Sequence, residues 1–235
     1  MSGHSKWATN KRAKEGKDTK RSGLFTKLAK AISIAARDGS DPEMNFKLRM
    51  AIDRAKKLSL PKDNIDRAIK SGSGENGGVI IEEFTYEGYG PNGVALIVET
   101  ISDNKNRTVS EVKHTFSKLG GNLGASGSVL WMFDRKGVIY LEATSINEEQ
   151  ELIIIDAGAE DIILEDDSVI IYTKDSDLHK IKESLEKNNL IISDSKLEYI
   201  AKDKAPIANE EKVIKIMDAL DKLDDVQNIY TNADI

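Results

Sequence analysis

The sequence predicts an α+β protein with an N-terminal three-helix domain and two α/β domains, the third ferredoxin-like (βαββαβ) and inserted in the second. Three observations support this prediction. Apolar residues recur at helical spacing before a Gly/Ser run at residues 71–78, strand-like periodicity begins after that run, and the charge changes sign there. The predicted domains are therefore residues 1–75, residues 76–134 with 206–235, and residues 135–205.

Composition excludes several classes of protein. With 235 residues, of which 39% are hydrophobic and 31% charged, the chain can build its own core and is not disordered throughout. It contains neither an apolar stretch of roughly 18 residues nor a secretion signal, so we expect a soluble, cytoplasmic protein. The absence of cysteine excludes disulfides, thiolate zinc sites, iron–sulfur clusters and cysteine nucleophiles.

Charge is divided unevenly along the chain. Residues 1–75 contain 18 Lys+Arg against 9 Asp+Glu, whereas the remaining residues contain 16 against 31. The net charge of −6 thus combines a basic first part with an acidic body. Such a basic part can bind a polyanion because the local field governs the approach of a charged partner.

The basic part begins with an arm, residues 1–23, that has almost no apolar side chains, and it continues as three helices. Helical spacing predicts the first helix from Leu24 to Ala36, with a stop at Asp38-Gly39. Asp41 and Pro42 predict the start of the second helix, as N-cap and first helical residue. Its apolar face contains Leu48, Ile52 and Ala55. Pro61 opens the third helix, which ends at residues 71–74.

The acidic body alternates strands and helices. We expect strands at 79–86 and 94–101 joined by a glycine turn at 88–93, a helix near 109–119, and a buried strand at 129–133 that places Trp131 and Met132 in the core. From Gly137 the order is βαββαβ, although Ile153-Ile154-Ile155 could also be a strand by propensity. A helix after Pro206 and a strand at 226–230 return to the first sheet, which makes the βαββαβ segment an insertion.

Several blocks of sequence match one known family. They are Gly3-His4-Ser5-Lys6-Trp7-Ala8, Asp41-Pro42, Leu48-Arg49, Pro61-Lys62-Asp63-Asn64-Ile65, Tyr86-Glu87-Gly88-Tyr89-Gly90-Pro91, Asp103-Asn104-Lys105-Asn106-Arg107-Thr108, Gly120-Gly121-Asn122-Leu123-Gly124, Gly127-Ser128-Val129 and Ala157-Gly158-Ala159-Glu160-Asp161. The chain resembles the YebC/PmpR family, whose mitochondrial relatives include the translational activator of cytochrome c oxidase. It departs from the family pattern at Phe46, where proline is usual, and at Asn92, where glycine is common.

The resemblance implies a three-domain fold around an open cleft. It also implies one of two roles, a DNA-binding transcriptional regulator or a ribosome-associated translation factor that binds RNA. We predict a nucleic-acid-binding regulator of gene expression. Regulation of transcription is the first hypothesis, and a role in translation is the alternative.

The candidate nucleic-acid-binding residues combine clustered cations, which suit phosphate groups, with one aromatic side chain that can stack on a base. They are Lys6, Trp7, Lys11, Arg12, Lys14, Lys17, Lys20, Arg21, Arg49, Lys56, Lys57, Lys105 and Arg107. The alternatives are a solvated tail, a solvated helix face, and packing of Trp7 on the bundle. The glycine loops at 88–93 and 120–127 could admit a ligand close to the backbone, or simply form turns.

Catalytic motifs are lacking, so we predict no enzymatic activity, no cofactor and no metal site. The chain has three scattered histidines and no serine in a nucleophile elbow. Two acidic groups, Glu165-Asp166-Asp167 and Asp224-Asp225, are interpreted as solvated turn carboxylates, and a magnesium-dependent nuclease is the remote alternative. The expected partner is DNA or ribosomal RNA, with the ribosome as a candidate, no membrane, and a monomeric chain.

Overall fold

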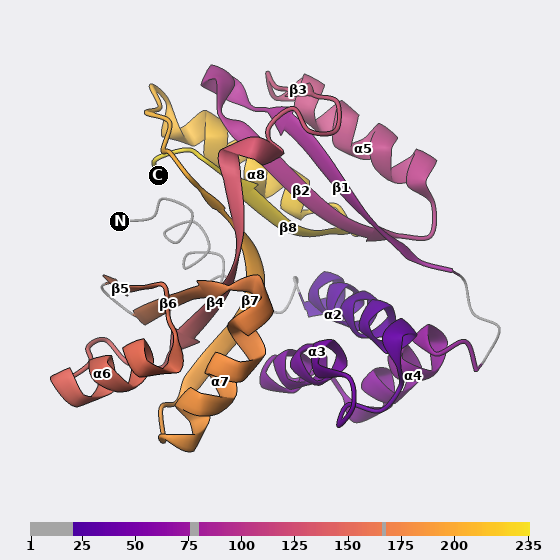
Figure 1. Cartoon of the computed structure of the whole chain (residues 1–235). Helices are drawn as coiled ribbons and strands as arrows, with labels where there is room; N and C mark the ends of the chain where they lie inside the picture. The colour runs from indigo at the N-terminus through magenta and orange to yellow at the C-terminus, as the bar shows by residue number, and fades with distance from the viewer. Residues whose placement is uncertain (1–20, 76–79, 166–167) are drawn as a thin grey trace. The chain divides into compact units, whose positions relative to one another are not determined.

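A computed structural model describes residues 21–75, 80–165 and 168–235 (Figure 1). The chain divides into two compact units. We call Asp134–Ile200 the inserted unit, and we call the described residues before and after it the main unit. No helix in the described part of the chain has the length and apolar character needed to cross a membrane.

The N-terminal part of the main unit consists of three packed helices. They are α2 (Arg21–Ala35, followed by the 3-10 turn Ala36–Asp38), α3 (Phe46–Lys57) and α4 (Lys62–Gly72). Their shared core includes Ile32 and Leu48, both fully buried. Ser33 on α2 donates a hydrogen bond to the Ala68 carbonyl on α4, at 2.8 Å. A Cβ at Gly72 would lie only 2.0 Å from the Ser33 carbonyl oxygen, so a glycine is required at this crossing.

The predicted start of the second helix is wrong. Asp41 accepts a hydrogen bond from the Glu43 amide in a turn, and helix α3 begins four residues later than predicted, after Asn45. The Asn45 side chain accepts from the Leu48 amide and donates to the carbonyls of Ala35 and Gly39, at 2.7 and 2.8 Å. Asn45 therefore caps α3 and also binds the end of the preceding helical segment.

The rest of the main unit is an antiparallel sheet covered by two helices. Its elements are β1 (Glu82–Tyr89), the turn η3 (Pro91–Gly93), β2 (Ala95–Ser102), α5 (Lys105–Lys118), β3 (Asn122–Leu123), the turn η4 (Leu130–Met132), α8 (Glu210–Asp221) and β8 (Val226–Thr231). The strand order is β3-β1-β2-β8. Phe116 of α5 and Met217 of α8 are fully buried in one core with strand residues such as Val98. The pairing of β8 with β2 confirms that the last helix and strand return to this sheet.

Gly88 lies inside strand β1 and not in the predicted turn. A Cβ at Gly88 would lie 2.6 Å from the Asn122 carbonyl oxygen and 2.8 Å from the Phe116 ring. The glycine therefore permits β3 and α5 to approach the strand closely. The turn itself lies further on, where Asn92 and Gly93 both have positive φ.

The predicted buried strand at 129–133 is also wrong. Leu130–Met132 form a 3-10 turn, and the Trp131 side chain is 65% exposed, not buried in the core. Met132 is half-buried. Strand β4 begins only at Phe133. The cause is Glu87 of β1, whose carboxylate accepts hydrogen bonds from the amides of Val129 and Leu130 and holds this apolar segment as a turn.

The inserted unit has the predicted βαββαβ order. Its elements are β4 (Phe133–Leu141), α6 (Glu148–Ala157), β5 (Asp161–Glu165), β6 (Ser168–Lys174), the turn η5 (Asp175–Asp177), α7 (Leu178–Lys187) and β7 (Ile192–Ala201). The strand order β5-β6-β4-β7 is ferredoxin-like. Ile153-Ile154-Ile155 are helical, in α6, which starts with a capping box between Asn147 and Gln150.

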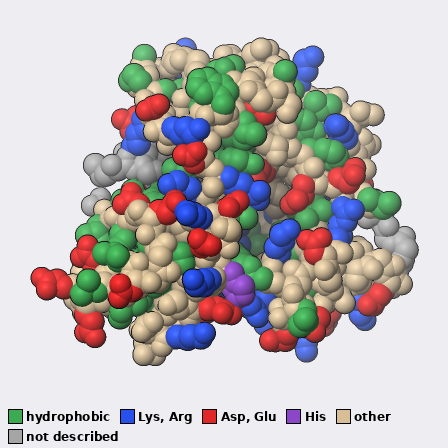
Figure 2. All heavy atoms as spheres, viewed as in Figure 1, with side chains coloured by type: hydrophobic (Ala, Val, Ile, Leu, Met, Phe, Trp, Pro, Cys, Tyr) green, Lys and Arg blue, Asp and Glu red, His purple; other side chains and the backbone are tan. Residues whose placement is uncertain are grey.

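The inserted unit is strongly acidic. Residues 134–200 contain 17 Asp+Glu against 7 Lys+Arg. Figure 2 shows acidic side chains gathered over α6, whose first turn contains Glu148, Glu149 and Glu151. Such a surface repels a polyanion, so a nucleic acid is expected to bind to the main unit.

Candidate nucleic-acid interface

Helix α3 is the strongest cationic element among the described residues. Its buried side chains, Leu48, Ile52 and Ala55, lie on one face, so the polar side chains project away from the core. These polar side chains comprise five cations and the single acid Asp53. The cations are Lys47, Arg49, Arg54, Lys56 and Lys57. The predicted orientation of the second helix's basic residues is therefore seen in α3.

The three predicted residues on α3 differ in their surroundings. Lys56 and Lys57 are exposed in the last turn, where the helix dipole favours positive charge. Arg49 is half-buried, with its guanidinium 5.7 Å from the centre of the Phe46 ring. This stacking holds the Arg49 group in place near the start of α3.

Two cations of α3 were missed by the sequence reasoning. Lys47 is exposed and forms an ion pair with Asp38 at 3.1 Å, and Arg54 is half-buried. The same helical spacing that placed Arg49, Lys56 and Lys57 outside the core would have found both.

Helices α3 and α4 are joined by a short turn at residues 58–61. Helix α2 packs on both of them, whereas α3 and α4 make few contacts with each other. A helix-turn-helix also joins two consecutive helices by a short turn, so this connection alone identifies no recognition helix. The cations of α3 suit phosphate groups, whose contacts position a protein on nucleic acid without reading its bases.

Seven of the predicted residues lie outside the described part of the chain. They are Lys6, Trp7, Lys11, Arg12, Lys14, Lys17 and Lys20. Arg21 is the first residue of α2. Of the acidic group Glu165-Asp166-Asp167, the last two residues are also outside the described part.

The lysines of α2 form hydrogen bonds with the end of α8 and with the turn that follows it. The Lys27 ammonium donates to the carboxylate and to the carbonyl of Asp221, at 3.1 and 2.6 Å. The Lys30 ammonium donates to the Asp225 carboxylate at 2.6 Å and to the Asp224 carbonyl at 3.1 Å. These two cations bind α2 to the C-terminal part of the main unit.

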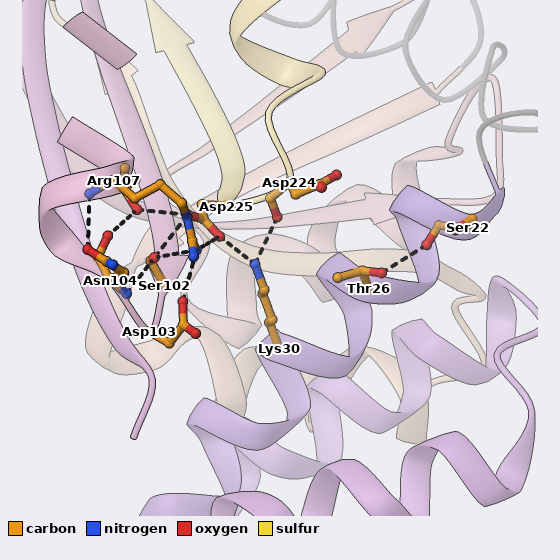
Figure 3. A network of polar contacts seen from close by, with 10 residues as sticks. Ser22, Thr26, Lys30, Ser102, Asp103, Asn104, Arg107, Asp224 and Asp225 are labelled. Carbon is orange, nitrogen blue, oxygen red and sulfur yellow. Dashed lines mark hydrogen bonds and ion pairs between the residues drawn. The ribbon is translucent and has the colours of Figure 1, made fainter. Parts of the chain in front are cut away.

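Asp225 is the centre of a polar network that Figure 3 shows in close view. Its side chain accepts hydrogen bonds from Lys30 at 2.6 Å and Arg107 at 2.9 Å, and from the hydroxyls of Ser102 at 2.9 Å and Thr108 at 2.7 Å. Asp225 is only 3% exposed. The interpretation of Asp225 as a solvated turn carboxylate is therefore wrong, because two cations and two hydroxyls replace its water.

The network shifts the pKa values of its members in opposite directions. Burial alone would raise the pKa of Asp225, but hydrogen bonds from Lys30, Arg107, Thr108 and Ser102 hold it well below its usual range. The hydrogen bond to Asp225 and a second one to Asp103 raise the pKa of Arg107 above its ordinary value. Both groups thus remain charged at neutral pH.

Stability should depend on pH through Asp225. A carboxylate whose pKa is lowered by folding stabilises the folded state above its unfolded pKa, and this contribution is lost as the pH falls. We expect the free energy of unfolding to decrease below about pH 4, near the ordinary pKa of aspartate. Urea unfolding of the parent chain and of Asp225→Asn, measured over this range, checks the prediction. Equal pH dependence in both chains would contradict it.

Family models match most of the chain. The model described as the TACO1/YebC protein N-terminal domain matches residues 5–75, and the one described as the TACO1/YebC second and third domain matches residues 81–233. The chain belongs to the TACO1/YebC family. This match confirms the family resemblance carried by the sequence motifs.

Relatives of the TACO1/YebC chain agree with this assignment. A protein of Halothermothrix orenii is 48% identical over 100% of this chain and 96% of its own length, and one of Thermoanaerobacter pseudethanolicus is 49% identical over 100% and 98%. Both are named as probable transcriptional regulatory proteins. The crystal structure of a conserved hypothetical protein from Aquifex aeolicus has a TM-score of 0.85, with 46% identity, and covers 92% of this chain and 91% of its own.

The Asp103–Thr108 motif that suggested the TACO1/YebC family builds the start of α5. Asn104 caps the helix by accepting from the Arg107 amide, and Arg107 and Thr108 bind Asp225. The structure therefore gives Arg107 a role inside the fold, which sequence reasoning missed. Lys105 is exposed, with its ammonium 5.4 Å from the centre of the Phe84 ring. The structure ties Arg107 to α2 through Asp225, not to the cations of α3.

The second glycine loop of the TACO1/YebC chain is held by a buried carboxylate. Glu87 of β1 is 4% exposed and accepts from the amides of Gly127, Val129 and Leu130, at 2.6, 2.8 and 2.8 Å. Burial alone would raise the pKa of Glu87, but these three backbone donors lower it overall. Of the two readings of the loop at 120–127, a structural turn is thus the one that these contacts favour.

Proposed function

We propose that this TACO1/YebC chain binds nucleic acid through the cations of α3 and of the N-terminal arm, and regulates transcription. The observation that carries the proposal is the composition of α3, which presents five cations and one acid opposite a buried apolar face. The names of the relatives, which call them probable transcriptional regulatory proteins, support DNA as the first ligand.

Phosphate contact is the mode of binding that we propose. Residues 1–75 are basic while the inserted unit is acidic, so a polyanion is attracted to one part of the chain and repelled by another. The cations of α3 suit phosphate groups, and phosphate contacts carry no sequence information, so the proposal includes no base readout by this helix. Arg107 is a poor probe of this surface, because its loss would also release Asp225.

Removing charge from α3 should weaken binding in a salt-dependent way. We expect the triple variant Arg49→Gln, Lys56→Gln and Lys57→Gln to bind a labelled DNA duplex about tenfold more weakly, because it loses contacts with phosphate groups. Each lost phosphate contact should also lower the slope of log K against log salt by about one. Fluorescence anisotropy between about 50 and 200 mM salt measures this slope.

The matched control removes three cations from the inserted unit. The variant Lys174→Gln, Lys180→Gln and Lys187→Gln changes the net charge equally at three exposed positions. Equal weakening by both triples would show that only bulk charge matters, and no weakening by the α3 triple would remove α3 from the interface. Deletion of residues 1–20 measures the contribution of the arm in the same assay.

Ribosome association through RNA is the second candidate function. Binding to phosphates and shape, for which the cations of α3 are suited, serves folded RNA as well as DNA. Sedimentation of the parent chain in a sucrose gradient at low and raised salt separates the two candidates. Salt-sensitive migration with ribosomes that the α3 triple loses would favour translation, and confinement to light fractions would favour transcription.

A further inference from the structure

Trp131 is a large aromatic side chain displayed on the surface of the main unit. It is 65% exposed, although tryptophan is highly buried on average. Exposure of this extent removes it from the core and leaves most of the ring available to another molecule. Neither the proposed contact with α3 nor the helix packing makes use of it.

The orientation of the Trp131 ring is set by hydrogen bonds. Its Nε1 donates to the Ser128 carbonyl at 3.1 Å, and the Tyr89 hydroxyl donates to the same carbonyl at 3.0 Å. The Lys202 ammonium donates to the Trp131 carbonyl at 3.0 Å, and the Lys202 amide donates to the Met132 carbonyl at 2.9 Å. Side chain and backbone are therefore both fixed.

The turn that carries Trp131 is held by hydrogen bonds to the Glu87 carboxylate. The three amides that this buried carboxylate binds belong to Gly127, Val129 and Leu130, which are three of the four residues before the tryptophan. A side chain held in this way loses little conformational freedom when it binds a ligand, so more of the contact energy appears as affinity.

The chemistry of the ring determines the kind of ligand. Because Nε1 already donates a hydrogen bond to the Ser128 carbonyl, a ligand can contact the ring only through its face. An aromatic face binds another flat aromatic group by stacking. Ala125, Ser126 and Gly127 are small, exposed neighbours in the same loop. The Lys202 cation lies beside the Trp131 carbonyl, which adds attraction for phosphate.

From this geometry we propose that Trp131 is a stacking platform for an unpaired nucleobase. The inference rests on the proposed function and adds to it a second contact with nucleic acid. This contact lies in the main unit, at the turn before β4, and does not involve α3. A protein partner is the competing ligand. The exposed neighbours of the ring are the small residues 125–127 and Leu130, and one cation, Lys202, lies at the Trp131 carbonyl. This cation favours the nucleobase, since the core of a protein interface is depleted in charged residues.

Fluorescence of Trp131 tests the proposal directly. The chain contains two tryptophans, so Trp7→Phe leaves Trp131 as the single indole in the full-length protein. We expect single-stranded RNA or DNA to quench this emission, and an abasic oligonucleotide of equal length to leave it unchanged. Quenching by only one of the two nucleic acids supports the proposal and identifies the source of the base.

Affinity provides the second measurement. In the same background, Trp131→Ala should bind the single-stranded oligonucleotide about tenfold more weakly, Trp131→Phe should retain part of the affinity, and neither should change binding of the abasic oligonucleotide. Ile191→Ala removes a similarly exposed hydrophobic side chain from the inserted unit and should have no effect.

The results that would contradict the stacking platform differ from those that would contradict the proposed function. Binding that depends on α3 but leaves Trp131 emission and the alanine variant unaffected would overturn the stacking platform alone. If Trp131→Ala keeps its oligonucleotide affinity but loses co-sedimentation with ribosomes, the ring contacts protein and the nucleobase proposal is wrong. Absence of all nucleic-acid binding would overturn both proposals.

Discussion

Replacing Asp225 by alanine should lower the free energy of unfolding by about 3 kcal/mol, because it leaves two cations facing a site without a carboxylate. Lys30 and Arg107 would lose their shared partner, and the hydroxyls of Ser102 and Thr108 would lose an acceptor. The side chains of Lys30 and Arg107 are partly exposed and can be hydrated again. The expected loss in the free energy of unfolding is therefore at the lower end of the range for breaking a buried ion pair. Urea unfolding at neutral pH measures it.

Asp224 provides the matched control for this prediction. It is the adjacent aspartate, but its side chain is exposed and only its backbone carbonyl binds Lys30. Asp224→Ala therefore removes the same charge and should change stability by less than about 0.5 kcal/mol. If both variants lose the same stability, the network does not hold α2 to the C-terminal turn.

Sequence periodicity predicted the elements whose structure is decided locally. The apolar faces of α2 and α3 follow from spacing alone, and so does the outward position of Lys56 and Lys57. The ferredoxin-like order of the inserted unit was also predicted, since alternating strands and helices with short connections leave few topologies. Local rules suffice to predict an element where the position of each residue depends on neighbours about one helical turn away.

Contacts between distant residues explain what was missed. Asp41 has a sound local capping signal, yet Asn45 caps α3 because its amide also reaches Ala35, ten residues earlier. The adjacent Asp224 and Asp225 are equivalent in sequence, and partners far away in the chain decide which one is buried. These partners are Lys30, Ser102, Arg107 and Thr108. No periodic pattern contains this information.

The same limit applies to Trp131. Val129–Phe133 is a continuous apolar run, for which a buried strand is the natural prediction. The carboxylate of Glu87, some forty residues earlier, binds the amides of Val129 and Leu130 and so forces a turn. The burial of Glu87 is seen only in the structure, so no pattern in the sequence identifies this contact.

Removing the Glu87 carboxylate should therefore destabilise the chain and release the turn that carries Trp131. Glu87→Ala leaves three backbone amides without their acceptor, and an unsatisfied donor costs about 1–3 kcal/mol when no water replaces the partner. Gly127 and Leu130 are exposed, so water can satisfy part of the loss, and we expect a decrease of about 3 kcal/mol in the free energy of unfolding. Urea unfolding measures this decrease, and hydrogen exchange at Gly127, Val129 and Leu130 should become faster.

Glu82 separates the effect of this carboxylate from the loss of any acid on strand β1. Glu82 lies on the same strand but is exposed, so Glu82→Ala should change stability by less than about 0.5 kcal/mol and leave exchange in the turn unaltered. Glu87→Gln keeps the shape of the side chain but replaces one acceptor oxygen by a donor, so it should lose at least the bonds made by that oxygen. Unchanged exchange in both Glu87 variants would mean that the turn is held by the Tyr89–Ser128–Trp131 contacts alone. Faster exchange together with weaker quenching of Trp131 by oligonucleotides would instead show that the carboxylate orders the ring for stacking.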